Sequence, residues 1–109
     1  MKLLVTKKQL GSAPAMWLRR AGYAYIPDRA GGQESFVRRL SRDFYPRFHI
    51  YFTAGQNRAG QEIITFNLHL DQKRPGYQGF RRHNAEDDGA VVAAEMERLK
   101  TFLAADLFV

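Results

Sequence analysis

The sequence predicts an α+β fold in which a three-stranded antiparallel meander has a short N-terminal helix and a longer C-terminal helix packed on one face, in the order α-β-β-β-α. Two observations predict it. Segments 47–52 and 64–71 alternate strictly between apolar and polar residues, and apolar residues recur at helical spacing between positions 89 and 107. With 109 residues, 45% of them apolar, the chain is long enough for one domain with a core and too short for two, so residues 1–109 are assigned to a single domain.

Residues 1–21 are predicted to contain one short helix. Residues 1–11 hold an apolar triplet followed by two lysines, which fits either a short edge strand or a flexible arm. Proline loses no hydrogen bond in the first turn of a helix and glycine commonly ends one, so Pro14 and Gly22 predict a helix over residues 14–21. Three apolar side chains of this helix are expected to pack inward: Met16, Trp17 and Ala21.

Two shorter extended segments are expected next. Residues 23–26 are predicted to form a strand or an extended exit from the helix. Residues 35–42 interleave apolar residues with arginines, which fits a strand with one bulge or a short helical turn, and the strand is favoured. Residues 43–46 then turn the chain into the alternating segments.

The two alternating segments are predicted to form a hairpin, because the polar connection 55–60 between them begins and ends with glycine. The predicted register aligns Thr53 with Ile63. A slip by one residue would exchange the two faces of a strand, so the parity of the register is strongly specified. The expected opposite pairs are Tyr51 with Thr65, His49 with Asn67, and Arg47 with His69.

The two faces of this hairpin differ in composition, because successive side chains of a strand point to opposite faces. The core face collects Phe48, Ile50, Phe52, Ile64, Phe66, Leu68 and Leu70. The other face collects Arg47, His49, Tyr51, Thr65, Asn67, His69 and Asp71. Such polar groups bind phosphate, metal ions or protons, so this second face, with no helix covering it, is the predicted functional site.

The C-terminal part combines an irregular segment with a helix. Residues 72–88 show no regular period, and loops of that length inside a compact domain are usually functional or disordered. The helix over residues 89–107 is preceded by Asp87 and Asp88, at a position where carboxylates can cap it and favour its dipole. Its apolar stripe consists of Val92, Met96, Leu99 and Leu103.

The charge of the chain is basic and unevenly distributed. Seventeen Lys and Arg against eleven Asp and Glu give a net charge of +6. Residues 1–50 carry ten basic and three acidic side chains (+7), residues 51–83 five and two (+3), and residues 84–109 two and six (−4). Such a basic excess is typical of nucleic-acid-binding proteins, although charge that merely keeps the chain in solution gives the same total.

Composition also excludes several classes of protein. The chain has no cysteine, so disulfides and thiolate zinc sites are excluded and a reducing compartment is favoured. The apolar run in residues 1–8 is too short for a signal peptide, and nowhere do about 18 apolar residues run together as a membrane span requires. These features predict a soluble cytoplasmic protein without a membrane partner.

The leading functional prediction is a small basic domain that binds nucleic acid, with RNA slightly favoured over DNA. It rests on the polar hairpin face and on the following loop 73–82, which combines cations with Tyr77 and Phe80 as single-strand binders do. The residues expected to contact nucleic acid are Arg39, Arg47, Tyr51, Asn67, Lys73, Arg74, Arg81 and Arg82.

The competing prediction is a metal-dependent nuclease or phosphodiesterase. His69 and Asp71 lie two residues apart on one strand face, and with Glu86 they are the expected ligands of a divalent metal ion in that case. His49 beside Tyr51 is a candidate general base, because imidazole titrates near neutral pH. The expected catalytic residues of such an enzyme are His49, His69, Asp71, His83 and Glu86.

Structural explanations for the same residues remain open. Asp71 fits a turn cap, and His49 fits a hydrogen bond across the hairpin to Asn67. A third class of function, a protein-interaction module for an acidic partner, would use the same basic surface.

Two resemblances follow from these patterns. The predicted order of elements resembles the double-stranded-RNA-binding fold and the related HicA-type toxins, which are messenger-RNA interferases. Those toxins carry a glycine and a serine or threonine before the catalytic histidine, whereas His49 follows Arg47 and Phe48, so their chemistry does not carry over. The stretch 67–73, with His83, Glu86, Asp88 and Gly89 beyond it, resembles a group of short uncharacterised bacterial proteins and implies no particular activity.

Overall fold

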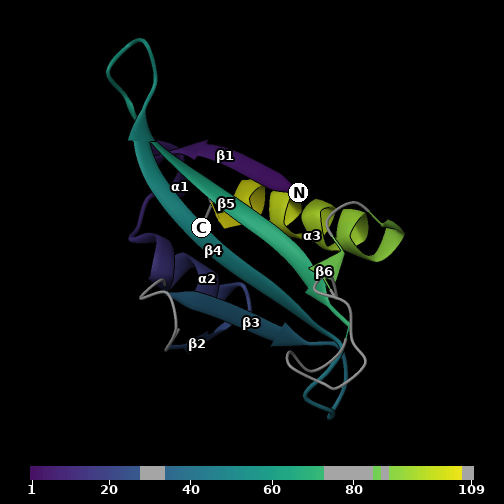
Figure 1. Cartoon of the computed structure of the whole chain (residues 1–109). Coiled ribbons are helices and arrows are strands. Elements are labelled where there is room, and N and C mark those ends of the chain that lie inside the picture. Colours follow the sequence, from purple (N-terminus) through teal and green to yellow (C-terminus); the bar gives the residue numbers. More distant parts are fainter. Residues whose placement is uncertain (28–33, 73–84, 87–88, 107–109) are drawn as a thin grey trace.

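A computed structural model of the chain describes residues 1–27, 34–72, 85–86 and 89–106 (Figure 1). The elements follow one another as β1 (Lys2–Thr6), α1 (Lys7–Leu10), α2 (Pro14–Arg20), β2 (Ala24–Ile26), β3 (Ser35–Arg39), β4 (Arg47–Gln56), β5 (Glu62–Asp71), β6 (Ala85–Glu86) and α3 (Ala90–Asp106).

The strands form one antiparallel sheet in the order β1-β5-β4-β3-β2, and the short β6 also pairs with β5. The predicted three-stranded meander is therefore wrong, although the α+β class is right. Residues 2–6 come back to pair with residues 63–67, far along the chain, and a periodicity measured within short windows carries no information about such a partner. The likeness to the double-stranded-RNA-binding fold rested on the meander and loses its basis.

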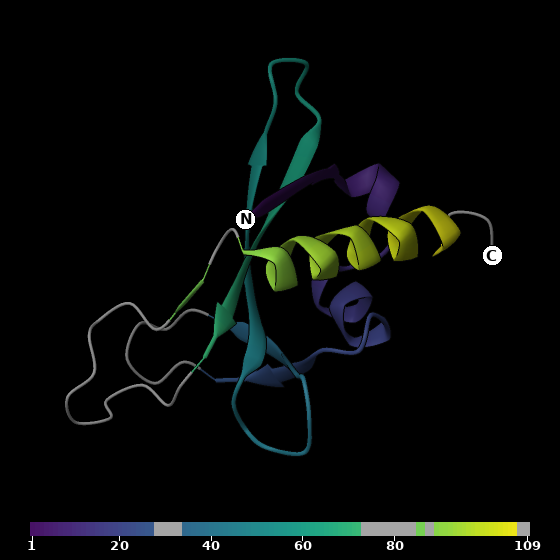
Figure 2. The same cartoon turned by 90° about the vertical axis from the view of Figure 1, so that its right-hand side faces the viewer.

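The described helices all lie on one side of the sheet (Figure 2). They cover the apolar face predicted from the alternation, where Trp17 of α2 packs its ring against Phe66 at a centroid distance of 5.2 Å and against Phe102 of α3 at 5.7 Å. The core comprises Leu3, Val5, Leu10, Trp17, Leu18, Ala21, Tyr23, Phe36, Phe48, Ile50, Ile64, Phe66, Leu68, Leu70, Val92, Met96 and Leu99. No described helix lies on the opposite side, which we call the open face.

The hairpin pairs with a register two residues away from the predicted one. The structure places His49 opposite His69, Tyr51 opposite Asn67 and Arg47 opposite Asp71. An error of two residues keeps the parity, so the predicted division of side chains between the core face and the open face is confirmed.

The register differs because the strands run further than predicted, through Gln56 and from Glu62. The loop between them is closed by Asn57, whose side-chain Oδ1 accepts hydrogen bonds from the backbone N–H groups of Ala59 (2.9 Å) and Gln61 (3.0 Å). Gly60 adopts a φ of 79°, a conformation that glycine takes without steric cost. This compact loop allows the last residues of both strands to pair.

The predicted helices are largely confirmed. α2 begins at Pro14 and buries Trp17, Leu18 and Ala21, but Met16 is 59% exposed and does not pack inward as expected. Near the N-terminus, the edge-strand alternative for residues 1–11 is the correct one, and the strand is followed by the single turn of α1. Of the predicted stripe of α3, Val92, Met96 and Leu99 are buried and Leu103 is partly buried.

One buried carboxylate ties α3 to the other elements. Glu95 is 4% exposed and accepts hydrogen bonds from Arg98 Nε (2.7 Å) and Nη2 (2.9 Å), from the Tyr23 hydroxyl (2.5 Å) and from Arg38 Nη1 (3.3 Å). Arg98 Nη2 also donates to the Ala21 carbonyl oxygen at 2.7 Å, which links α3 to the end of α2. Burial, followed by the adjacent Glu95 charge, raises the pKa of Tyr23 far above its ordinary value. We call these four side chains the Glu95 cluster.

Candidate functional site on the open sheet face

Five side chains of β4 and β5 meet on the open face. Arg47, His49 and Tyr51 come from alternate positions of β4, and His69 and Asp71 come from alternate positions of β5. The register brings them together, because His49 lies opposite His69 and Arg47 lies opposite Asp71. We call this group the His–Asp cluster.

Asp71 is the centre of the charge interactions in the His–Asp cluster. Its Oδ2 lies 3.3 Å from Arg47 Nε and 3.4 Å from His49 Nδ1. The exposed fractions of the Arg47, His49 and Asp71 side chains are 9%, 26% and 14%. Burial alone would raise the pKa of Asp71, but the hydrogen bonds and charges of His49 and Arg47 outweigh it, so the pKa lies below its usual range. Asp71 is therefore a carboxylate at neutral pH.

The three rings of the cluster lie next to one another. The centroid of His69 is 5.3 Å from that of Tyr51 and 5.5 Å from that of His49, and the Tyr51 and His69 planes are tilted by 31°. The His49 and Tyr51 centroids are 6.4 Å apart. The three centroids form a triangle, and all three rings are partly exposed, so they form part of the accessible surface of the sheet.

The two ring nitrogens of His49 differ in their contacts. Nδ1 faces the carboxylate of Asp71, whereas Nε2 is buried and has no hydrogen-bond partner among the residues that the structure describes. The predicted alternative, in which His49 bonds to Asn67 across the hairpin, is wrong, because the register places His69 there. An imidazole with a carboxylate on Nδ1 has its tautomer and orientation set, which leaves Nε2 as the atom that could take a proton.

Arg47 is enclosed by the loop that precedes β4. Its guanidinium lies 4.8 Å from the ring centroid of Phe44 and 4.6 Å from that of Tyr45. The guanidinium of Arg39, from the paired position on β3, lies 4.7 Å from the same Phe44 ring. Arg47 is thus occupied by Asp71 and two rings within the protein, whereas Arg39 and Phe44 are exposed.

Other predicted site residues fall in different places. Asn67 lies on the open face opposite Tyr51, and Asp71 holds a charge pair rather than capping a turn. Several predicted contacts lie outside the described residues: Lys73, Arg74, Arg81, Arg82 and His83. Asp87 and Asp88, the predicted caps of α3, also lie outside them.

The predicted metal ligands do not form a described site. The backbone of Glu86 pairs with Leu70, between the positions of His69 and Asp71, and its side chain is not described. Within the described part of the chain, no three His, Asp or Glu side chains gather as a metal ion would require. The carboxylate of Asp71 is already engaged by Arg47 and His49.

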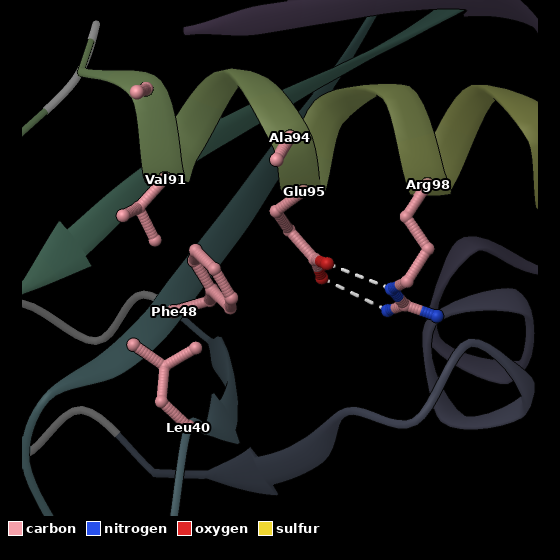
Figure 3. Close-up of a pocket in the computed structure, with 7 residues that line it drawn as sticks. Leu40, Phe48, Val91, Ala94, Glu95 and Arg98 are labelled. Carbon is pink, nitrogen blue, oxygen red and sulfur yellow. Dashed lines mark hydrogen bonds and ion pairs between the residues drawn. The ribbon is translucent and has the colours of Figure 1, made fainter.

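A groove lies on the helix side of the sheet, between α3 and the end of β3. Figure 3 shows its apolar walls, with Leu40 and Phe48 on one side and Val91 and Ala94 on the other. The groove has a volume of about 450 Å³. The charged residues at its edge, Glu95 and Arg98, bond to each other and belong to the Glu95 cluster. The groove therefore offers a surface for apolar contact and no described group for acid or base chemistry.

Two parts of the site were missed from the sequence. Phe44 and Tyr45 were expected only to turn the chain, yet they stack on Arg39 and Arg47. An aromatic pair next to a strand that begins with arginine is a signal that could have indicated this stacking. The pairing of Asp71 with His49 depended on the register and had no local signal.

The fold and the open face define a class of protein: a small antiparallel α+β domain whose helices cover one face of the sheet and whose other face carries polar and aromatic side chains. No protein family, no curated protein and no solved structure matches this chain. Among the described helices, none is long and apolar enough to cross a membrane.

Proposed function

We propose that this chain binds single-stranded nucleic acid, RNA ahead of DNA, through the open face. The observation that carries the proposal is the triangle of partly exposed rings formed by Tyr51, His69 and His49 on a sheet face that no described helix covers. Sheets with helices on one face and aromatic residues on the other stack unpaired bases, and base stacking tolerates any sequence because every base has a π face. RNA is placed first because single-stranded RNA segments are the usual targets of such sheets.

The charges around the rings support the same proposal. The net charge is +6, and residues 1–83 together carry +10, the sum of +7 and +3. Lys2, Arg39 and Arg42 are exposed near this face, with Lys2 opposite Asn67 and Arg39 opposite Arg47 in the sheet. These cations are available to phosphates, whereas Arg47 is compensated by Asp71. Stacking and phosphate contacts would therefore come from different residues, and a cytoplasmic location would suit such a protein.

Replacing both Tyr51 and His69 with alanine is expected to weaken binding about 5- to 150-fold per lost base stack, because stacking on an aromatic side chain contributes roughly 1–3 kcal/mol. Fluorescence anisotropy with labelled single-stranded RNA and DNA, titrated over a salt series, measures the change. The slope of affinity against salt should stay the same, because no phosphate contact is removed.

Thr53→Ala is the matched control, because Thr53 is exposed on the same strand and carries no ring. It should leave affinity unchanged. Absence of binding at low salt, or binding that does not fall as salt rises, would remove the proposal. An acidic protein partner bound in place of nucleic acid would support the interaction-module alternative instead.

A second candidate function is cleavage of RNA without a metal ion, and the Asp71 carboxylate 3.4 Å from His49 Nδ1 favours it. In that reaction substrate binding would have to uncover the buried Nε2, which would then accept the proton of a ribose 2′-hydroxyl, whose oxygen attacks the adjacent phosphorus. The bond from phosphorus to the 5′ oxygen breaks, and the imidazolium of His69 would protonate that oxygen, leaving a 2′,3′-cyclic phosphate and a 5′-hydroxyl. Asp71 would hold His49 in place throughout.

Under this candidate, the chain should cut RNA in the presence of a chelator and leave DNA intact, because DNA has no 2′-hydroxyl. His49→Ala should abolish cleavage and weaken binding by no more than the loss of one base stack, about 5- to 150-fold, whereas Thr53→Ala should do neither. Labelled RNA and DNA incubated with chelator, magnesium or manganese separate this mechanism from the metal-dependent nuclease. Cleavage that requires the metal ion supports the latter, and intact substrate under every condition rules out both on these substrates.

A further inference from the structure

The outer edge of β1 presents backbone groups in a regular pattern. Met1 and Leu68 exchange two hydrogen bonds, from the Met1 amino group to the Leu68 carbonyl at 2.9 Å and from the Leu68 N–H to the Met1 carbonyl at 2.8 Å. Hydrogen-bonded and non-hydrogen-bonded pairs alternate in an antiparallel ladder, so Leu3 and Val5 also bond to β5. Lys2, Leu4 and Thr6 consequently direct their N–H and C=O groups away from the sheet.

One of these outward groups is already used within the chain. The Thr6 N–H donates to the Gln9 side chain at 2.8 Å as part of the cap of α1, so the N–H groups that remain for an outside strand belong to Lys2 and Leu4. Within the described residues, no strand pairs with this edge of β1. Leu4 is also 63% exposed, the largest value among the exposed large apolar side chains of the described residues. An edge that is open in this way is a template for another strand.

We propose that this edge pairs with the same edge of a second copy of the chain, antiparallel and about a two-fold axis at Leu3. In this register Lys2 of each copy lies opposite Leu4 of the other. Both N–H groups and both C=O groups of Lys2 and Leu4 then have partners, since each residue exchanges two bonds with the residue it faces. The inference does not depend on the proposed nucleic-acid binding.

The alternative register, with Leu4 facing Leu4, satisfies fewer groups. It would place the carbonyl of Lys2 opposite the Thr6 N–H of the second copy, which is already bonded to Gln9. The favoured register also suits the side chains, because the aliphatic stem of each Lys2 covers the exposed Leu4 of the other copy and no like charges face each other. The interface is small, so a reversible dimer is expected.

The dimer would join two open faces into one continuous surface. Leu4 lies opposite Thr65 in β1–β5 pairing, and its side chain therefore belongs to the open face. Across the two-fold axis, the polar faces of the two sheets would adjoin at Lys2 and Leu4.

Sedimentation of the full chain at concentrations up to about 1 mM tests the proposal. The wild-type chain should approach twice the monomer mass as concentration rises. Leu4→Lys places a lysine opposite Lys2 of the other copy at two symmetric positions and should raise the dissociation constant at least about tenfold. Leu4→Glu places an opposite charge there and should keep the dissociation constant within about threefold of the wild-type value.

Met16→Lys is the matched control, because Met16 is similarly exposed but lies on α2. It should leave dimerisation unchanged. All three substitutions are at exposed positions, and thermal unfolding followed by circular dichroism checks that each variant is folded. A wild-type chain that stays monomeric overturns the proposal, even if it captures an extended peptide of another protein. A dimer that Leu4→Lys leaves intact, or that Leu4→Glu abolishes, also overturns it.

Discussion

Replacing Glu95 with alanine is expected to lower the free energy of unfolding by about 3–5 kcal/mol, because it removes the acceptor of the buried Tyr23 hydroxyl and of two partly buried guanidinium groups. Arg98 and Arg38 both bond to the Glu95 carboxylate, as does the Tyr23 hydroxyl. None of these donors has another described carboxylate within reach, so the cost of their burial would no longer be offset. Urea denaturation followed by circular dichroism measures the loss.

Glu97→Ala serves as the control for Glu95→Ala. Glu97 lies on the same helix, but its side chain is 73% exposed, and its ion-pair partner within the described residues is Lys100, at 3.6 Å. Its replacement should change the unfolding free energy by no more than about 0.5 kcal/mol. Equal stability of the two variants would contradict the structural role assigned to Glu95.

The pH dependence of stability provides a second measurement on the Glu95 cluster. The pKa of Tyr23 is raised in the folded chain, so above its ordinary value of 10.0 the unfolded chain loses the tyrosine proton while the folded chain keeps it. The contribution of this group is complete below that pH and is lost as the pH rises further. Tyr23→Phe should therefore flatten the alkaline decline in stability.

Replacing Asp71 with alanine is expected to cost about 2–4 kcal/mol, because Arg47 is buried and would lose its carboxylate partner. The rings of Phe44 and Tyr45 would still contact the Arg47 guanidinium, which places the expected cost below that of Glu95→Ala. Urea denaturation at neutral pH gives the comparison.

Acid unfolding tests the same role of Asp71 independently. Its pKa is lowered in the folded chain, so the stability it contributes is present above its ordinary pKa and is lost as the pH falls through the folded value. The wild-type chain should lose stability as the pH falls below the ordinary Asp pKa of 3.8, and Asp71→Ala should lose less over the same range. Asp43→Ala, at an exposed carboxylate, is the control and should leave the acid limb unchanged. If Asp71→Ala lost as much stability at low pH as the wild-type chain, the stabilising role of the Asp71 carboxylate would be contradicted.

Side-chain periodicity was enough to predict the division of the hairpin into two faces. Phe48, Ile50 and Phe66 lie against the helices, and His49 and His69 lie on the open face, because a strand alternates its side chains whatever its partner. α3 followed in the same way from the spacing of its apolar stripe. The proline and glycine around residues 14–21 marked α2 because their backbone preferences act locally.

The partners of the strands were not predictable in this way. β1 lies beside β5 because its apolar residues Leu3 and Val5 are buried there, a contact between distant segments that no local pattern encodes. The length of the paired strands and the geometry at Asn57 set the register of the hairpin, and only that register places Asp71 beside His49 and Arg47. Glu95 is a charged residue on the buried side of α3. It is accommodated there because Tyr23 and Arg38, from distant segments, donate hydrogen bonds to its carboxylate.

By itself, then, the sequence determined which residues face the helices, which face away from them, and where α2 and α3 lie, since these properties depend on backbone periodicity and on local conformational preferences. The tertiary structure alone decided the order of the strands, the pairing of Asp71 with His49, the enclosure of Arg47 and the burial of Glu95. Each of these depends on the distance between groups that are far apart along the chain, and that distance is set by how the whole sheet and its helices pack together.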